Sequence, residues 1–291
     1  MTRSKKHLSS AQIAIYLFLM ALPAARAAAP LPFLWRVDGP SPSFLFGTVH
    51  SADPKVKVIA PAVLKALDRC ASFHPEIELS PELAGRMALR LFTATAPDLE
   101  SRLPSPLWKR ARSAGEQLGL PEPVLRRLSP GLAALLFSAP FDETEISATV
   151  DGQLYARSQS RGLEIIALET VDEQLDLFDN LQPTPARALL AESLDDFEAG
   201  HPRLAQLLAA YASGDERRIA AEVEAGFKNS SVRELAGPLL YRRNTTMSGR
   251  AEPYLRRGKA FVAVGVAHLV GPSGMIALLR SRGFRITRVQ P

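Results

Sequence analysis

One short pattern occurs twice in this chain and limits the folds that it can adopt. An apolar run ends in Gly-x-x-His, and a proline follows four residues after the histidine. The first copy lies in residues 44–54 and the second in residues 259–272, and their histidines are His50 and His268. Short apolar runs bounded by turn residues are typical of buried strands, and ligands of α/β sheets bind beyond the carboxyl ends of the strands. We therefore expect the two histidines to lie at strand ends and to meet across one pocket.

The order of the other patterns indicates an α/β protein with a central sheet and flanking helices. Strands are expected at residues 44–47, 72–79, 163–169, 259–264 and 284–289. Helices are expected at residues 61–69, 81–93, 104–118, 121–137, 143–159, 183–211, 214–227, 232–255 and 272–282. Thr170 and Glu173 have the spacing of a capping box at the start of a further helix. We expect one domain, residues 30–291, with a helical insertion at about residues 80–140.

The first 29 residues resemble a secretory signal peptide. A basic start precedes an apolar segment at residues 11–22, and small residues at 27–29 offer a cleavage site. An uncleaved membrane anchor is the alternative, but this apolar segment is short of the roughly 20 residues that a spanning helix needs. The protein is therefore expected to be periplasmic or secreted, with no stable membrane span after cleavage.

Removal of this segment changes the charge of the chain. Of the 35 basic residues, four lie in residues 1–29, which leaves 31 basic residues against 30 acidic ones. A nearly neutral protein lacks the basic surface of a nucleic-acid-binding protein, so no nucleic-acid partner is expected. Cys70 is the only cysteine, so no internal disulfide can form, and its place in an apolar pattern favours a buried structural role over a catalytic one.

Histidines and carboxylates at strand ends are the residue types of a metal site. His50 and His268 are the candidate ligands, together with Glu76 or Glu78 and with Glu169 as base or further ligand. Imidazole nitrogen and carboxylate oxygen suit zinc, manganese or iron, and a bound ion of this kind activates water and polarises a carbonyl group.

Other sites have less support in the sequence. There is no His-Glu-x-x-His pair, no Gly-x-Ser-x-Gly elbow, and no glycine loop of the Walker or Rossmann kind. His74 is a reserve ligand because it lies close to Glu76, and His201 is expected at the surface in a break between two helices. A strand-end histidine can also serve only to hold the structure together, and the repeated motif is the reason to favour a functional role.

Four segments together resemble the TraB/PrgY/GumN family, which is related to Tiki proteases and to erythromycin-esterase-like and ChaN-like proteins. These segments are residues 46–50, 167–175, 243–247 and 261–271, and the resemblance runs in order over most of residues 34–289. It implies a mixed central sheet with two related halves, each containing a strand followed by Gly-x-x-His, and a metal-dependent hydrolase site. The family pattern maps onto His50, Glu76, Asp151, Glu169, Arg243, Asn244 and His268.

The chain departs from the family pattern at the first carboxylate. The family has an apolar strand before this residue, whereas here His74 and Pro75 precede Glu76, so Glu78 remains an alternative. We expect an exported metal-dependent hydrolase that acts on a peptide, ester or related carbonyl bond of a peptide or small-molecule substrate. The alternative is a non-catalytic binding or regulatory protein that sequesters a peptide, a metal-bearing ligand or a polysaccharide intermediate.

Overall fold

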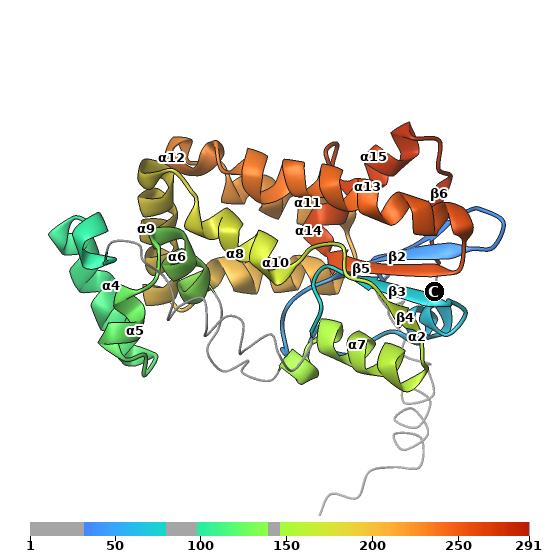
Figure 1. Cartoon of the computed structure of the whole chain (residues 1–291), viewed down its shortest axis with the longest axis horizontal. Coiled ribbons are helices and arrows are strands. Elements are labelled where there is room, and N and C mark those ends of the chain that lie inside the picture. The colour runs from blue at the N-terminus through green and yellow to red at the C-terminus, as the bar shows by residue number, and fades with distance from the viewer. Residues whose placement is uncertain (1–31, 80–97, 139–145, 291) are drawn as a thin grey trace, which may run out of the picture. The chain divides into compact units, whose positions relative to one another are not determined.

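A computed structural model describes residues 32–79, 98–138 and 146–290. These residues form the strands β1 (Leu34–Val37), β2 (Ser43–Thr48), β3 (Ser72–Pro75), β4 (Glu164–Ile165), β5 (Ala260–Gly265) and β6 (Ile286–Arg288). They build a six-stranded sheet in the order β4-β3-β5-β2-β1-β6. The strands β4, β3, β5 and β2 run parallel, and β1 pairs antiparallel with β2 and β6 (Figure 1). The expected α/β fold with a mixed central sheet is confirmed.

Helices cover both faces of this sheet. One face packs against α10 (Pro202–Ser213), α11 (Glu216–Gly226), α13 (Arg242–Arg257), α14 (Val266–Leu269) and α15 (Met275–Ser281), and the other against α2 (Pro61–Leu67) and α7 (Val150–Ser160). Successive strand residues point to opposite faces, so Leu45 and Val262 join the first core while Phe46 and Phe261 join the second. Both faces of the central strands are therefore buried.

A third apolar core lies among helices outside the sheet. It joins α4 (Ser105–Gln117), α5 (Glu122–Arg126), α6 (Pro130–Ser138), α8 (Val171–Asp179) and α9 (Pro183–Glu198). The remaining short helices are η1 (Glu100–Arg102), η2 (Ile146–Ala148), α12 (Ser230–Arg233) and the π-helical turn η3 (Gly237–Tyr241). The described part of the expected insertion is thus helical, while the helix expected at residues 81–93 lies outside the described residues.

Several expected helices are shorter than the sequence pattern suggested. Residues 121–137 contain two helices instead of one, and residues 232–255 divide around η3, whereas α9 and α10 are separated at the break expected around His201. The strand expected at residues 163–169 is reduced to β4. The capping box is confirmed at the start of α8, where Thr170 Oγ1 accepts the N–H of Glu173 and Glu173 accepts the N–H of Thr170.

The strand expected at residues 72–79 ends at Pro75. β3 lies inside the sheet between β4 and β5, and Pro75 is its last residue. The missing N–H is tolerated there because the ladder ends, and the Pro75 carbonyl still accepts the N–H of Leu168 at 2.9 Å. Glu76 therefore follows a fully buried strand directly, whereas Glu78 lies beyond it and is exposed.

Three further residues with reactive or titratable side chains, Cys70, His74 and His201, contact neighbouring groups of the fold. Cys70 is buried, its thiol donates to the Ala66 carbonyl at 3.3 Å, and burial raises its pKa to about 12. His74 is fully buried between the Ile166 carbonyl and the Ser72 hydroxyl. His201 was expected at the surface, but its side chain is only 18% exposed and faces Asp196.

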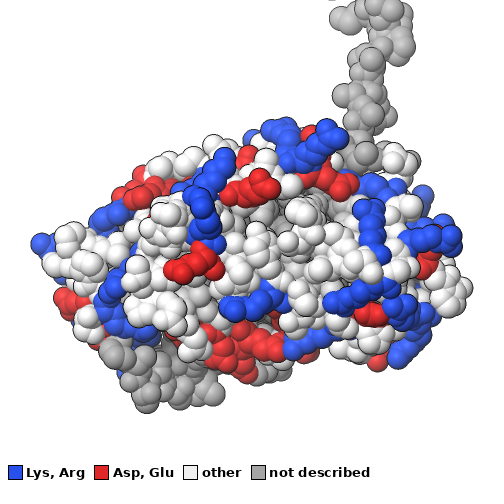
Figure 2. Space-filling view, turned by 90° about the horizontal axis from the view of Figure 1, so that it is seen from above, with Lys and Arg blue, Asp and Glu red and all other residues white. Residues whose placement is uncertain are grey.

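The surface seen in Figure 2 carries both signs of charge. Basic and acidic side chains alternate on this face, and uncharged areas lie between them. Within residues 32–79, 98–138 and 146–290, no helix has the length and apolar character needed to cross a bilayer.

Candidate functional site

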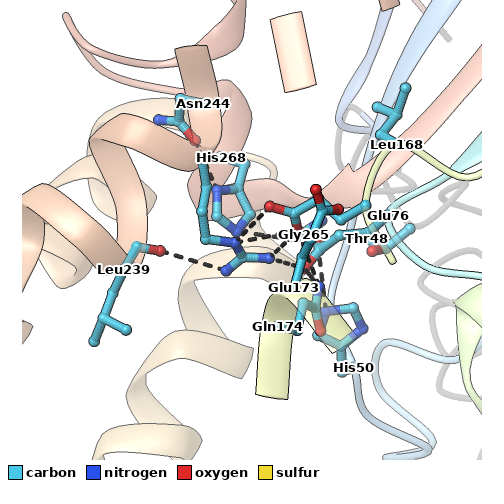
Figure 3. A network of polar contacts seen from close by, with 12 residues as sticks. Thr48, His50, Glu76, Leu168, Glu173, Gln174, Leu239, Asn244, Gly265 and His268 are labelled. Carbon is cyan, nitrogen blue, oxygen red and sulfur yellow. Dashed lines mark hydrogen bonds and ion pairs between the residues drawn. The ribbon is translucent and has the colours of Figure 1, made fainter. Parts of the chain in front are cut away.

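Four strands end at the same edge of the sheet and carry the candidate residues to it. His50 follows β2, Glu76 follows β3, Glu169 follows β4, and His268 lies in the short helix α14 directly after β5. Because these strands are parallel, their carboxyl ends meet at one edge, where α/β sheets bind ligands. Figure 3 shows His50, Glu76 and His268 pointing toward one another.

Glu76 lies between the two histidines. Its Oε2 atom is 4.0 Å from Nε2 of His50 and 4.0 Å from Nε2 of His268. The backbone N–H of Gly265 also donates to this oxygen at 3.2 Å. Glu76 and His268 are largely buried, whereas the His50 side chain is 61% exposed. The site therefore opens to solvent on the His50 side.

Hydrogen bonds fix the orientation of both imidazole rings. His50 Nδ1–H donates to Asp151 Oδ2 at 2.9 Å, and the other Asp151 oxygen accepts from Thr48 Oγ1 at 2.7 Å. His268 Nδ1–H donates to Asn244 Oδ1 at 2.7 Å. With Nδ1 bonded to these partners, the Nε2 atom of each ring faces Glu76. Partners of this kind orient histidines that bind metal ions.

The orientation of Asn244 is set in turn by the backbone. Its Nδ2 donates to the Ser273 carbonyl at 2.8 Å. That bond places the amide oxygen, which can only accept, against His268. The two histidines thus differ in their supports, since His50 contacts an anionic carboxylate and His268 a neutral amide.

Space excludes a side chain at the first motif glycine, Gly47, but not at the second, Gly265. A Cβ atom on Gly47 would lie 2.8 Å from Cγ2 of Val266. At Gly265 a Cβ would lie 3.6 Å from Glu76 Oε2, from His50 Nε2 and from His268 Cδ2. The backbone of Gly265, with φ −49° and ψ 132°, is one that any residue adopts. The absence of a side chain at Gly265 therefore leaves room for about one methyl group beside the three side chains.

Arg243, in the first turn of α13, connects the two carboxylates of the site. Its Nη2 pairs with Glu76 Oε1 and with Glu169 Oε2, the latter at 2.7 Å, and its Nε donates to Glu169 Oε1 at 3.0 Å. Gln174 in α8 donates to the same two carboxylates at 2.9 and 3.0 Å. Both carboxylates are therefore held by partly buried donors.

The charges of the site follow from these contacts. The neighbouring Asp151 carboxylate raises the pKa of His50 to about 9, and burial lowers the pKa of His268 to about 4. Burial opposes ionisation of Glu76, but the two histidines, Arg243 and the Gly265 N–H outweigh it and hold its pKa at about 2. In the absence of a bound ion at neutral pH, Glu76 is anionic, His268 is neutral and His50 carries a proton.

The donor set suits a divalent cation by its chemistry. Two anchored imidazole nitrogens and one carboxylate oxygen surround the open space at Gly265, which is the ligand type that zinc, manganese and iron accept. The 4.0 Å separations are wider than those of a preformed centre, and the described ranges contain no group of three His, Cys, Asp or Glu spaced to hold a metal ion.

The structure brings together every residue that the family pattern mapped. His74 and His201 lie elsewhere, and Glu78 points to solvent. Sequence reasoning overlooked Gln174 and noted Asp151 only as part of the family pattern. Gln174 could have been found from its place one turn after Glu169, four residues beyond the capping residue Thr170.

Comparison with known proteins agrees with this arrangement. The sequence model of the TraB/PrgY/gumN family matches residues 33–288. The chain belongs to this family. It is also 24% identical over 316 aligned positions to the protein named "Metalloprotease TIKI2" of Danio rerio, covering 89% of this chain and 61% of that relative. No solved structure matches the chain.

Proposed function

We propose that this TraB/PrgY/gumN protein is an exported, metal-dependent hydrolase of a peptide, ester or related carbonyl bond. One observation carries the proposal: Glu76 Oε2 lies 4.0 Å from Nε2 of both motif histidines, and open space at Gly265 adjoins all three side chains. The relative named as a metalloprotease supports a hydrolase of this class.

Each residue of the site has a distinct part in this proposal. His50, Glu76 and His268 would hold the metal ion, which when bound lowers the pKa of a water molecule and polarises a carbonyl group. Asp151 and Asn244 keep the two imidazole rings turned toward the ion. The solvent-exposed face at His50 admits the substrate.

Arg243 and Glu169 position the proposed ligand Glu76. Both Glu169 oxygens accept from Arg243, so we assign Glu169 to the positioning of Arg243, in place of the base or ligand role expected from the sequence. Arg243 in turn holds Glu76 with one oxygen toward the histidines. Removal of Arg243 would leave two buried carboxylates without their guanidinium partner, which is strongly destabilising.

Metal binding is the first test. Purified protein is titrated with Zn²⁺, Mn²⁺ and Fe²⁺, and bound metal is measured by elemental analysis for the wild type, His50→Ala and His268→Ala. We expect about one ion per chain in the wild type and its loss in both variants, because a catalytic site uses three protein ligands. His201→Asn is the control, since this histidine lies outside the site and asparagine tolerates its φ of 59°. No uptake by the wild type of any of the three ions would overturn the metal site.

Hydrolysis is the second test. A panel of peptides and esters is incubated with the metal-loaded wild type and with His268→Ala, and products are identified by mass spectrometry. Cleavage by the wild type alone supports the hydrolase.

The ion pairs of Arg243 with Glu76 and Glu169 favour a non-catalytic binding protein as the alternative function. With Glu76 and Glu169 paired to Arg243, no carboxylate of this group is free to accept a proton from water. A non-catalytic protein that uses the same site to bind a peptide, a metal-bearing ligand or a polysaccharide intermediate fits this arrangement. Metal uptake together with no hydrolysis of any substrate in the panel would favour this alternative.

A further inference from the structure

A cavity of about 440 Å³ adjoins the proposed site on the far side of His268. Asn244 lines this cavity, and its amide oxygen accepts from His268 Nδ1. The chain segment that follows His268, from Val270 to Gly274, forms another part of the wall. A single side chain therefore separates the cavity from a proposed metal ligand, and its volume lies in the range of small-ligand pockets.

The walls of the cavity are mainly apolar. Val223 and Phe227 face it from the end of α11, Leu240 from η3, and Val270 from the loop after α14. Small residues, Ala220 among them, leave room between these side chains. Charged residues of the wall, such as Glu224 and Arg233, are exposed, so the interior is suited to an uncharged apolar group.

The backbone around the cavity is irregular in the way that binding sites often are. Gly237–Tyr241 is a π-helical turn, a feature that is frequent at functional sites. The same continuous segment carries Leu240 into the cavity wall and Arg243 into the polar site one turn later. A group bound in the cavity would thus contact the element that positions Glu76.

We propose that this cavity is the specificity pocket of the site and takes a large apolar side chain, such as leucine or phenylalanine, of a peptide substrate. This proposal rests on the proposed function for the identity of the substrate. A peptide that reaches from the His50–His268 site past Asn244 would place one of its side chains against the apolar walls. An ester with a short polar acyl group would leave the cavity unfilled.

Two substitutions narrow the cavity from opposite walls. Ala220→Phe projects from α11, and Gly237→Phe projects from η3, where an added Cβ has no atom within 4 Å and φ is not in the left-handed region. Gly226→Phe is the matched control, because this exposed glycine of α11 also has open space around it but does not line the cavity. None of these residues contacts the proposed metal ligands.

Binding is measured so that the result does not depend on catalysis. Two acetylated tripeptide amides, which differ only in a central phenylalanine or alanine, are titrated into the full-length mature protein and followed by NMR. We expect the phenylalanine peptide to bind the wild type and Gly226→Phe about tenfold more tightly than the alanine peptide, the scale of discrimination by an apolar pocket. In Ala220→Phe and Gly237→Phe this ratio should fall to about one.

The outcomes separate this proposal from the proposed function. Equal binding of the two peptides by the wild type, or an unchanged ratio in both narrowed variants, would overturn the specificity pocket even if metal binding and hydrolysis are found. If the two peptides bind in the expected ratios but the protein takes up no metal ion, the specificity pocket is supported and the metal-dependent hydrolase is contradicted. Circular dichroism and elemental analysis of each variant establish that the fold and the metal content are those of the wild type.

Discussion

A substitution at Gly265 fills space beside the proposed metal ligands without changing any ligand. An alanine there would place its methyl group 3.6 Å from Glu76 Oε2 and from His50 Nε2, in ordinary van der Waals contact. We expect Gly265→Ala to fold normally, with a free energy of unfolding unchanged or raised by about 0.4–1 kcal/mol, because the backbone is compatible with alanine. Its affinity for the metal ion that the wild type binds should fall by about tenfold or more, the effect of disturbing ligand orientation.

The control for this substitution is Gly249→Ala. Gly249 lies in α13, and a Cβ there has its nearest contact at 3.8 Å, with Arg282 Nη1. Titration calorimetry gives the metal affinity, and urea denaturation gives the stability. Wild-type affinity in Gly265→Ala would show that the metal ion does not occupy the space beside this glycine.

Single residues were predictable from the sequence where a repeated pattern identified them. The two Gly-x-x-His copies pointed to His50 and His268 without knowledge of the fold. The reason for each glycine was not predictable, because it depends on neighbours from other segments. Gly47 lies in a regular strand, and the close approach of Val266 excludes a side chain there.

At the scale of single elements, the start of α8 carries a testable pH dependence. Hydrogen bonds and ion pairing with Arg250, and the Thr170 N–H, lower the pKa of Glu173 from 4.5 to about 2. Because the folded-state pKa is depressed, the carboxylate contributes stability that is fully present above about pH 4.5 and is lost as the pH falls toward 2. We expect the stability difference between wild type and Glu173→Gln to shrink over this window, measured by urea denaturation at several pH values.

Thr170, the other residue of the capping box, is uncharged and also stabilises the start of α8. Thr170→Ala should lower the free energy of unfolding by about 1 kcal/mol, the usual effect of losing an N-cap hydrogen bond. This loss should be nearly constant between pH 4.5 and 7, because the hydroxyl does not titrate. A pH-independent effect of Glu173→Gln would contradict the ion pair with Arg250.

Elements with local signals were easier to predict than elements set by tertiary contacts. The capping box, the proline at the start of α2 and the strand β5 follow from residues close together in the chain. The place of β3 does not, because Pro75 is unfavourable inside a sheet and is accepted only as the last residue of its strand. The π-helical turn before α13 has no sequence signal that we recognise.

At the scale of the whole molecule, the order of the strands decides which residues meet. The sequence patterns placed His50, Glu169 and His268 at the ends of separate strands and Glu76 within another, but only the order β4-β3-β5-β2 makes these strands adjacent. The distances to Arg243 and Gln174 depend further on how α13 and α8 pack, which no local pattern contains. The resemblance to a family could name Arg243, though it did not name Gln174, because it reflects complete folds rather than single segments.

The proposal of export makes a prediction about the whole chain. The basic start and the apolar segment at residues 11–22 have the composition of a cleaved signal, and residues 1–29 carry four of the 35 basic residues and none of the 30 acidic ones. When the chain is produced in a Gram-negative host with a carboxyl-terminal tag, we expect tagged protein in the periplasmic fraction. Its first residue, read by mass spectrometry, should lie between Ala28 and Pro30.

Leu17→Asp with Leu19→Asp should keep the uncleaved chain in the cytoplasm, because charges in the apolar segment prevent its insertion. Wild-type protein that stays in the cytoplasm with Met1 intact would contradict export, and it would leave the metal site and the specificity pocket to be judged by their own experiments.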